Sequence, residues 1–176
     1  MRVIAGEFRS RRLRSLPGPH LRPTPDRLRE TLFDILAPQI EGVAFLDAYA
    51  GTGAVGIEAL SRGASEAIFI ERSRAAVDLI RENLQSLGIE TRAQVFCAKA
   101  LAVLPRLKAE IVFLDPPYDL AAEYAAALEL LGAAPPPLVI VQHDVRLDLR
   151  EECGRLRRTR TVRQGDSVLS FYAEGS

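Results

Sequence analysis

The segment Asp115-Pro116-Pro117-Tyr118 directly follows an apolar run, Ile111–Leu114, and combines groups that suit chemistry on an amine. Proline fixes φ and has no N–H group, so two successive prolines make a stiff turn whose carbonyls are free to accept hydrogen bonds. Acceptors on the N–H bonds of an exocyclic base amine favour a pyramidal, nucleophilic nitrogen, and a tyrosine ring can stack on the base. Asp115, Pro116 and Tyr118 are therefore the predicted catalytic residues. The alternative is a rigid turn with an exposed tyrosine.

A glycine-rich segment, Leu46–Gly56, has the sequence LDAYAGTGAVG and follows another apolar run. Its glycines let the backbone approach a ligand closely, and the helix N-terminus behind them favours negative charge. The spacing G-x-G-x-x-G also occurs in dinucleotide sites. Asp47, however, suits an ammonium or sulfonium group better than a pyrophosphate, and S-adenosylmethionine carries both groups. Glu71, twenty residues after Gly51, can accept both hydroxyls of its ribose. A tight turn beside solvated carboxylates is the alternative.

Alternating strands and helices must position these two motifs. Apolar runs predict strands at Val43–Leu46, Ala67–Ile70, Ala93–Phe96, Ile111–Leu114 and Leu138–Val141. Helices are predicted at Ala54–Arg62, at Ala76–Leu87 before Gly88, and around Tyr124, Leu128 and Leu131. The segments Arg155–Arg163 and Ser167–Tyr172 predict a terminal antiparallel hairpin. The predicted fold is a doubly wound α/β domain with a mostly parallel, seven-stranded sheet that ends in this hairpin.

Residues 1–38 are predicted to form a basic extension of the domain at 39–176. Met1–Phe8 and Arg12–Leu16 are expected as two short strands of a hairpin. Thr24 is expected to cap a helix that has Pro25 at its first position and ends near Pro38.

The net charge of zero hides two basic ends around an acidic middle. Residues 1–30 hold eight arginines and three acids, and residues 146–163 hold seven arginines and three acids, whereas residues 31–145 hold eight bases and fifteen acids. Basic ends favour a polyanionic partner such as nucleic acid. Solvated surface charge is the alternative.

Composition excludes several classes of protein. With 176 residues, 48% of them hydrophobic and 26% charged, the chain is long enough for one globular domain. No apolar run approaches the roughly 18 residues of a membrane span, and the charged N-terminus has no secretory signal. Two cysteines, Cys97 and Cys153, predict a reduced, cytoplasmic protein, and His20 and His143 lack a metal-like neighbourhood.

The motifs Asp47–Gly56, Glu71 and Asp115–Tyr118, in this order, resemble class I S-adenosylmethionine-dependent methyltransferases with a Rossmann-like fold that act on exocyclic amines. The resemblance narrows to the RsmD family, whose members methylate the N2 amine of a guanine in 16S ribosomal RNA. The segments that carry this resemblance are Arg2–Gly6, Arg9–Leu13, Arg22–Phe33 and Gly56–Ala64. It covers essentially the whole chain.

The resemblance implies a role for each matching residue. Asp47, Gly51 and Gly53 would hold the methionine part of the cofactor, Glu71 its ribose, and residues 98–100 would border its adenine. The predicted cofactor-binding residues are therefore Asp47, Tyr49, Gly51, Gly53, Glu71, Ala100 and Asp115. Lys99 departs from the family, which often has Asp or Asn there, because lysine accepts no hydrogen bond.

The predicted RNA-contacting residues are Arg9, Arg11, Arg12, Arg22, Thr24 and Arg27. The resemblance implies 16S rRNA as partner, within a small ribosomal subunit or an assembly intermediate, and a monomeric, cytoplasmic enzyme without a metal or a membrane. Three alternatives stay open: methylation of adenine N6 in DNA, a nicotinamide-dependent oxidoreductase, and an RNA-binding module without catalysis. The first uses the same Asp-Pro-Pro-Tyr chemistry, the second leaves Asp115–Tyr118 without a role, and an intact cofactor loop argues against the third.

Overall fold

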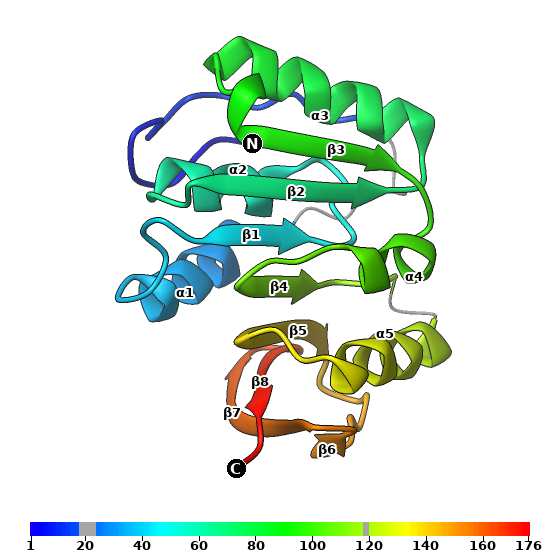
Figure 1. Ribbon diagram of the computed structural model, residues 1–176. Coiled ribbons are helices and arrows are strands. Elements are labelled where there is room, and N and C mark those ends of the chain that lie inside the picture. The colour runs from blue at the N-terminus through cyan, green and yellow to red at the C-terminus, as the bar shows by residue number, and fades with distance from the viewer. Residues whose placement is uncertain (18–23, 118–119) are drawn as a thin grey trace.

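The computed structural model describes residues 1–17, 24–117 and 120–176 (Figure 1). Within them, eight strands form one sheet in the order β3-β2-β1-β4-β5-β8-β7-β6. The strands are β1 Ala44–Asp47, β2 Glu66–Glu71, β3 Ala93–Cys97, β4 Ile111–Leu114, β5 Leu138–Asp144, β6 Glu152–Cys153, β7 Leu156–Gln164 and β8 Ser167–Glu174. The helices are α1 Asp26–Leu36, α2 Ala54–Ser61, α3 Arg74–Leu87, α4 Ala100–Val103 and α5 Ala121–Ala133, with 3₁₀ turns at Glu90–Arg92 and Leu104–Arg106.

The sheet confirms the predicted doubly wound α/β fold. Strands β1 to β5 pair in parallel, and β8, β7 and β6 continue the sheet with antiparallel pairs. The predicted terminal hairpin is β7–β8. The sheet has one strand more than predicted, because the two residues of β6 are too few to give a pattern in the sequence.

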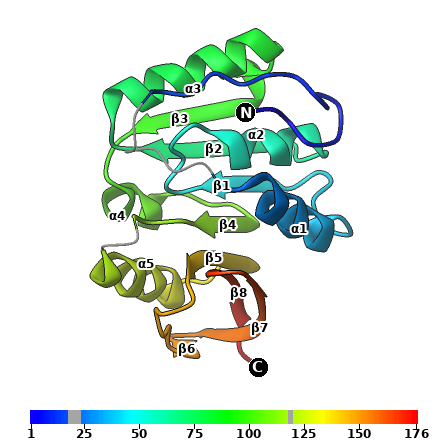
Figure 2. The same ribbon diagram turned by 180° about the vertical axis from the view of Figure 1, so that it is seen from behind.

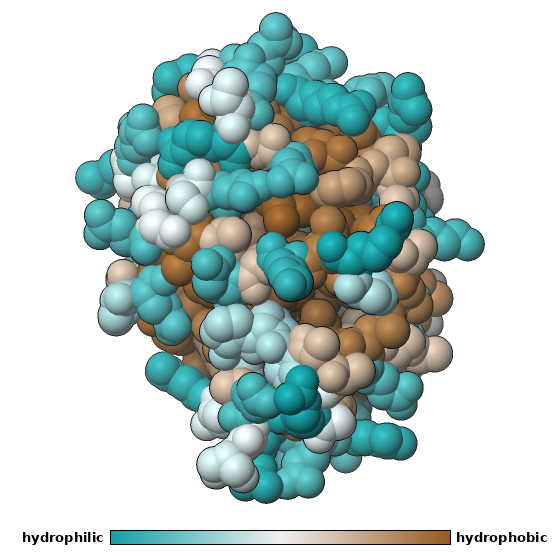
Figure 3. Space-filling view, viewed as in Figure 1, coloured by the Kyte–Doolittle hydropathy of each residue, from teal (hydrophilic) through white to brown (hydrophobic). Residues whose placement is uncertain are grey.

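Helices cover both faces of the sheet. On one face, alternate residues of the strands, such as Phe45 and Phe113, pack against α1 and α2, and α3 extends this layer over β2 (Figure 2). On the other face, the intervening residues, such as Leu46 and Leu114, pack against α4 and α5. Figure 3 shows hydrophobic residues across the middle of the face seen in Figure 1, with hydrophilic residues around its margin. The central runs of β1, β2 and β4, and Leu138–Val141 of β5, are apolar because both of their faces are buried, whereas the edge strand β3 includes the exposed Gln94.

Local signals mark both ends of α3, and the predicted stop at Gly88 is confirmed. The Ser73 side chain accepts a hydrogen bond from Ala76 N at 3.3 Å and caps the N-terminus of the helix. Gly88 ends the helix with a φ of 68°, a conformation that glycine adopts without a steric penalty. The helix is therefore specified within its own segment.

Residues 1–17, here called the N-terminal arm, do not form the predicted hairpin of two strands. The segments Met1–Phe8 and Arg12–Leu16 meet in one isolated antiparallel bridge, between Arg2 and Arg12, and no strand is assigned within the arm. Buried side chains of the arm pack instead into the apolar cluster of α2 and α3.

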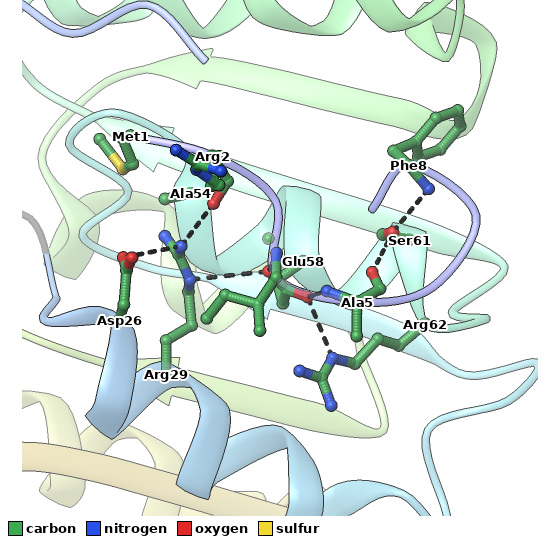
Figure 4. A network of polar contacts seen from close by, with 12 residues as sticks. Met1, Arg2, Ala5, Phe8, Asp26, Arg29, Ala54, Glu58, Ser61 and Arg62 are labelled. Atoms are coloured by element: carbon green, nitrogen blue, oxygen red, sulfur yellow. Dashed lines mark hydrogen bonds and ion pairs between the residues drawn. The ribbon is translucent and has the colours of Figure 1, made fainter. Parts of the chain in front are cut away.

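The backbone amides of the arm bond to side chains of α2 (Figure 4). The Glu58 carboxylate accepts hydrogen bonds from Ile4 N at 2.9 Å and Ala5 N at 3.0 Å, and the Ser61 hydroxyl accepts one from Phe8 N at 3.0 Å. The two segments do share backbone hydrogen bonds, among them Val3 N to Arg11 O and Leu13 N to Met1 O, both at 2.9 Å. The prediction of two strands was wrong because this pairing stays limited to one bridge, while other amides of the arm bond to side chains of α2.

Candidate active site

A cavity of about 1480 Å³ lies at the carboxyl ends of the parallel strands. Strand order reverses at β1, which lies between β2 and β4, and this is where open α/β sheets bind ligands. The predicted site residues that line the cavity are Asp47, Tyr49, Gly51, Glu71, Ala100, Asp115, Pro116 and Thr24. The fold therefore brings the glycine loop and the Asp-Pro-Pro turn, more than sixty residues apart, to one space.

The glycine loop joins β1 to α2. Gly53 takes the N-cap position of α2 with a φ of 82°, a region that residues with a side chain rarely adopt. A Cβ atom at Gly56 would come within 2.3 Å of the Phe69 ring, so this glycine serves the packing of α2 on β2. Gly51 lines the cavity, whereas Gly53 is not on its lining and acts through the turn.

Glu71, at the end of β2, holds the glycine loop in place. Its carboxylate accepts a hydrogen bond from Gly51 N at 2.8 Å and another from Ser73 N at 3.0 Å. Carboxylate oxygens have more than one acceptor position each, so two hydroxyl donors from a ribose can still be accommodated. Glu71 thus connects the loop that approaches the ligand to the strand end where a ribose is predicted.

Two carboxyl groups share the floor of the cavity. Asp47 is 1% exposed, and burial raises its pKa to about 7, although a hydrogen bond from Gly56 N at 3.1 Å opposes this and the charge of Glu71 adds to it. Asp115 is partly exposed to the cavity. Burial of its carboxyl group, together with the charge of Asp47, raises its pKa to about 8. A cation in the cavity would stabilise the ionised form of both groups, which fits an ammonium or sulfonium ligand.

The Asp-Pro-Pro turn is held from α5. The Tyr124 hydroxyl donates a hydrogen bond to Pro116 O at 3.0 Å in a buried position, and Leu120 N donates one to Pro117 O at 3.0 Å. The prediction that the carbonyls of this turn are free is therefore wrong for both prolines. A carbonyl can accept a second hydrogen bond, and Asp115 is the acceptor of this turn that faces the cavity with its side chain.

Tyr49 and Lys99 line the cavity from two further elements. The Tyr49 hydroxyl donates to Glu123 Oε1 of α5 at 2.7 Å, and burial raises the pKa of this tyrosine. Lys99 takes the N-cap position of α4, directly before the buried Ala100. Tyr49 thus both shapes the cavity and ties the glycine loop to α5.

The predicted RNA-contacting residues lie in different places. Thr24 lines the cavity, but it does not cap α1, because its hydroxyl donates to Gln142 Oε1 at 3.3 Å and Pro25 takes the N-cap position. Arg27 is exposed in the first turn of α1. Arg22 and Tyr118 lie outside the described residues.

The turn of the N-terminal arm that carries Arg9 and Arg11 lies at the opposite edge of the sheet from the cavity. The Arg11 guanidinium donates to Ser86 O at 3.0 Å, near the end of α3, and a helix that crosses between parallel strands ends at their amino ends. Figures 1 and 2 both show the dark blue turn of the arm beyond the tails of the strand arrows. Arg9 and Arg12 are exposed on either side of Arg11.

Several polar residues that line the cavity were not predicted from the sequence. Gln142 and Asp144 belong to the end of β5, and Ser167 begins β8. The signal for Gln142 and Asp144 was available, because polar residues follow the apolar run Leu138–Val141 as they follow the other parallel strands. Arg146, the first residue of the basic stretch Arg146–Arg163 that the sequence predicts to contact RNA phosphates, also lines the cavity. Arg146 is paired with Asp144 through Nε at 2.8 Å.

Among residues 1–17, 24–117 and 120–176, no group of three or more His, Cys, Asp or Glu side chains is placed to hold a metal ion. None of the helices there combines the length and the apolar character that a membrane crossing requires.

Comparison with known proteins gives a consistent set of relatives. A family model described as Conserved hypothetical protein 95 matches residues 1–173. The chain is 33% identical to the putative rRNA methyltransferase YlbH of Bacillus subtilis over 98% of both chains. It is 44% identical to ribosomal RNA small subunit methyltransferase D of Escherichia coli over 67% of this chain and 60% of that protein. The solved structure of the putative methyltransferase yhhF from Escherichia coli matches with a TM-score of 0.84 and 33% identity, over 99% of this chain and 97% of that one.

Proposed function

This chain belongs to the RsmD family, whose model is described as Conserved hypothetical protein 95, and from that premise we propose that it is a ribosomal RNA methyltransferase that uses S-adenosylmethionine. We propose further that the methyl group goes to the exocyclic N2 amine of a guanine in small-subunit (16S) rRNA. The observation that carries the proposal is the shared cavity of Asp47, at the glycine loop, and Asp115, at the Asp-Pro-Pro turn. The carboxyl group of Asp47 suits a cationic cofactor, and that of Asp115 suits the amine of the substrate.

The residues of β1 and β2 fit the cofactor. Asp47 offers a buried carboxylate to the ammonium or sulfonium group, and Glu71 offers acceptors to the ribose hydroxyls. The N-terminus of α2 would favour the carboxylate of the methionine part, and residues 98–100, which line the cavity, would border the adenine. When bound, S-adenosylmethionine supplies a methyl group on a sulfonium centre.

Asp115 would hold the target amine. Its carboxylate accepts the N–H bonds, so that the nitrogen lone pair is directed to the methyl group, and Tyr118 would stack on the base. Positioning of two reactants contributes up to about 7–11 kcal/mol to a barrier, and most of the catalysis is expected from this term. Neither cysteine lines the cavity, which supports direct transfer without a covalent intermediate on the protein.

The RNA would contact residues 1–38 as well as the cavity rim. We propose that this segment faces the RNA, that the substrate is the rRNA within a small ribosomal subunit or an assembly intermediate, and that the chain acts as a monomer. Exposed arginines of the arm and Arg27 at the start of α1 support an anionic partner.

Methyl transfer from labelled S-adenosylmethionine tests the proposal. The substrates are unmodified small ribosomal subunits, the matching free rRNA and unmethylated duplex DNA, and the product nucleosides are identified by mass. The expected product is N2-methylguanosine from one of the two ribosomal substrates. N6-methyladenine in the DNA would replace the proposal by the DNA alternative, and no transfer to any substrate with the cofactor bound would overturn the choice of substrate.

A further inference from the structure

The cavity extends past Asp115 on the side away from the cofactor residues. Strand β4, which ends at Leu114 before Asp115, lies between β1 and β5 in the sheet. The predicted cofactor residues Asp47 and Glu71 end β1 and β2, so a base whose amine meets Asp115 must lie toward β5. The groups on β5 that line this part of the cavity are therefore next to the base.

Gln142 is the buried polar side chain at this position. It is 2% exposed, it lies on β5 and it lines the cavity. The parallel register pairs Leu114 of β4 with Val141 of β5, so the next position along each strand places Asp115 beside Gln142. Registered residues of neighbouring strands point to the same face and lie about 4.8 Å apart, so both side chains reach the same side of the cavity.

The Gln142 amide is hydrogen-bonded to Thr24. The Thr24 hydroxyl, 8% exposed, donates to Gln142 Oε1 at 3.3 Å, while no hydrogen bond joins Gln142 Nε2 to another residue in the described part of the chain. Gln142 lines the cavity, so its Nε2 group is open to a ligand there, and an acceptor on the ligand can form the hydrogen bond that no residue supplies. Gln142 therefore offers a hydrogen-bond donor next to the carboxylate of Asp115.

This donor and acceptor pair matches the hydrogen-bonding edge of guanine. The N2 amine and the O6 carbonyl stand at the two ends of the Watson–Crick edge of that base, with the N1–H group between them. When the amine of adenine faces Asp115, the position opposite Gln142 carries a C–H group, which accepts no hydrogen bond. Base-modifying enzymes recognise a displaced base along this edge.

We propose that Gln142 is a specificity-determining residue that donates from Nε2 to O6 of the target guanine while Asp115 accepts from its N2 amine. Thr24 is the positioning residue that holds the amide of Gln142 at the wall of the cavity. The inference rests on the proposed function and adds to it the group that recognises guanine.

The test compares two target bases. Ribosomal RNA is prepared with guanine or with 2-aminopurine at the methylated position, and kcat/KM is measured for the unaltered protein and for Gln142→Met. 2-Aminopurine keeps the amine at C2 but has no oxygen at C6. Gln142→Met is expected to lower kcat/KM about tenfold on guanine and to leave the value on 2-aminopurine unchanged, because a single hydrogen bond is removed. The preference for guanine then falls about tenfold.

The positioning role of Thr24 has its own variants. Thr24→Val is expected to lower the same preference, and Thr24→Ser, which keeps the hydroxyl, is expected to restore it. If Gln142→Met fails to fold, these two variants still decide the proposal, since they act on the position of the amide.

Two results would overturn the assignment in distinguishable ways. An equal loss of kcat/KM on both bases in Gln142→Met would make Gln142 a structural residue only, while N2-methylguanosine from the unaltered protein would leave the proposed function in place. Absence of N2-methylguanosine from the unaltered protein would overturn the proposed function and this inference together.

Discussion

Buried carboxyl groups occur in two regions of this molecule, and their surroundings differ. Glu58, on α2 below the N-terminal arm, is completely buried and accepts hydrogen bonds from Ile4 N, Ala5 N and Arg62 Nε at 2.9 to 3.0 Å. Arg29 Nε lies 3.6 Å from it (Figure 4). In the cavity, Asp47 accepts one hydrogen bond, from Gly56 N, and Asp115 accepts none from the residues that the structure describes.

This difference distinguishes Glu58, which has a structural role, from Asp47 and Asp115, which form a ligand site. A buried charge is tolerated when hydrogen bonds and opposite charges compensate it, and the surroundings of Glu58 supply both. The carboxyl groups of the cavity lack this compensation, so their pKa values rise to about 7 and about 8. A strongly perturbed pKa in a cavity marks a functional group more often than a structural one.

The largest expected effect concerns Asp115. Asp115→Ala removes the acceptor for the target amine, so methyl transfer is expected to fall about a thousandfold or more. Transfer is measured in single turnover with saturating RNA, and cofactor binding by calorimetry. Because this carboxyl group is poorly compensated, the melting temperature is not expected to fall.

Loss of cofactor binding in Asp115→Ala would contradict the division of roles between Asp115 and Asp47. A lowered melting temperature would show that Asp115 is compensated like Glu58, which would remove the contrast between the two regions.

The second largest effect concerns Glu58. Glu58→Gln removes the charge opposite the buried guanidinium of Arg29 and is expected to lower the free energy of unfolding by about 3 kcal/mol. The melting temperature should fall by roughly 6–12 °C, as measured by calorimetry. The matched control is Glu82→Gln, which breaks the exposed pair with Arg14 and should change stability by less than about 1 kcal/mol. If the two variants lowered the free energy of unfolding equally, burial of the Glu58 ion pair would add nothing to stability.

The α/β core was predictable because its signals are local or periodic. A parallel sheet covered on both faces needs strands with apolar central runs, and each predicted run became a strand whose ends lie within three residues of the prediction. The helix Arg74–Leu87 carries its own start and stop signals, Ser73 and Gly88. Neither kind of signal requires knowledge of a distant segment.

The N-terminal arm was not predictable because its partners are distant in sequence. Ile4 and Ala5 bond to Glu58, more than fifty residues away, and Thr24 bonds to Gln142, which is 118 residues away. A short polar segment shows the same alternation whether its amides meet another strand or a side chain, so the strand prediction failed there.

The candidate site was predictable in part, because the topology of the sheet follows from the apolar runs. Asp47, Glu71 and Asp115 each follow an apolar strand, and the carboxyl ends of parallel strands meet at one edge, so their convergence follows from the topology. Gln142 also follows an apolar run, but its proposed role depends on its register beside Asp115 and on its hydrogen bond with Thr24, which precedes α1. Sequence spacing contains neither fact.

The third prediction uses the titration of Asp47. Its pKa of about 7 lies above the ordinary value of 3.8, so below pH 7 the cofactor must displace a proton from this group. The dissociation constant of S-adenosylmethionine, measured by calorimetry, is therefore expected to rise up to about tenfold from pH 8 to pH 6. Asp47→Asn should bind more weakly and without this dependence. A flat profile in the unaltered protein would show that Asp47 does not face the cationic groups.

Titration of Asp47 and Asp115 is expected to change the stability of the cofactor-free protein in the direction opposite to the change in cofactor affinity. Between about pH 4 and pH 8 the folded state retains protons on Asp47 and Asp115 that the unfolded state has lost, because both folded pKa values are raised. Stability of the cofactor-free protein is therefore expected to fall as pH rises through this window, whereas cofactor affinity rises. Melting temperatures across the range, with Asp47→Asn and Asp115→Asn as comparison, separate this contribution from that of other groups.

The smallest expected effect concerns the RNA side of the N-terminal arm. Arg9→Glu with Arg12→Glu should weaken RNA binding and reduce the salt dependence of log K by about one for each lost phosphate contact. The control reverses Arg106 and Lys108, which are exposed near α4 on the other face, so that the change in net charge is the same. Binding is measured at several salt concentrations. A reduced slope in the arm variant alone would mean that the RNA reaches from the cavity to the amino edge of the strands, and that Glu58 holds a binding surface in place. Equal slopes in both variants would leave the arm as a packing element of α2 and α3, and the RNA would then be confined to the cavity side of the sheet.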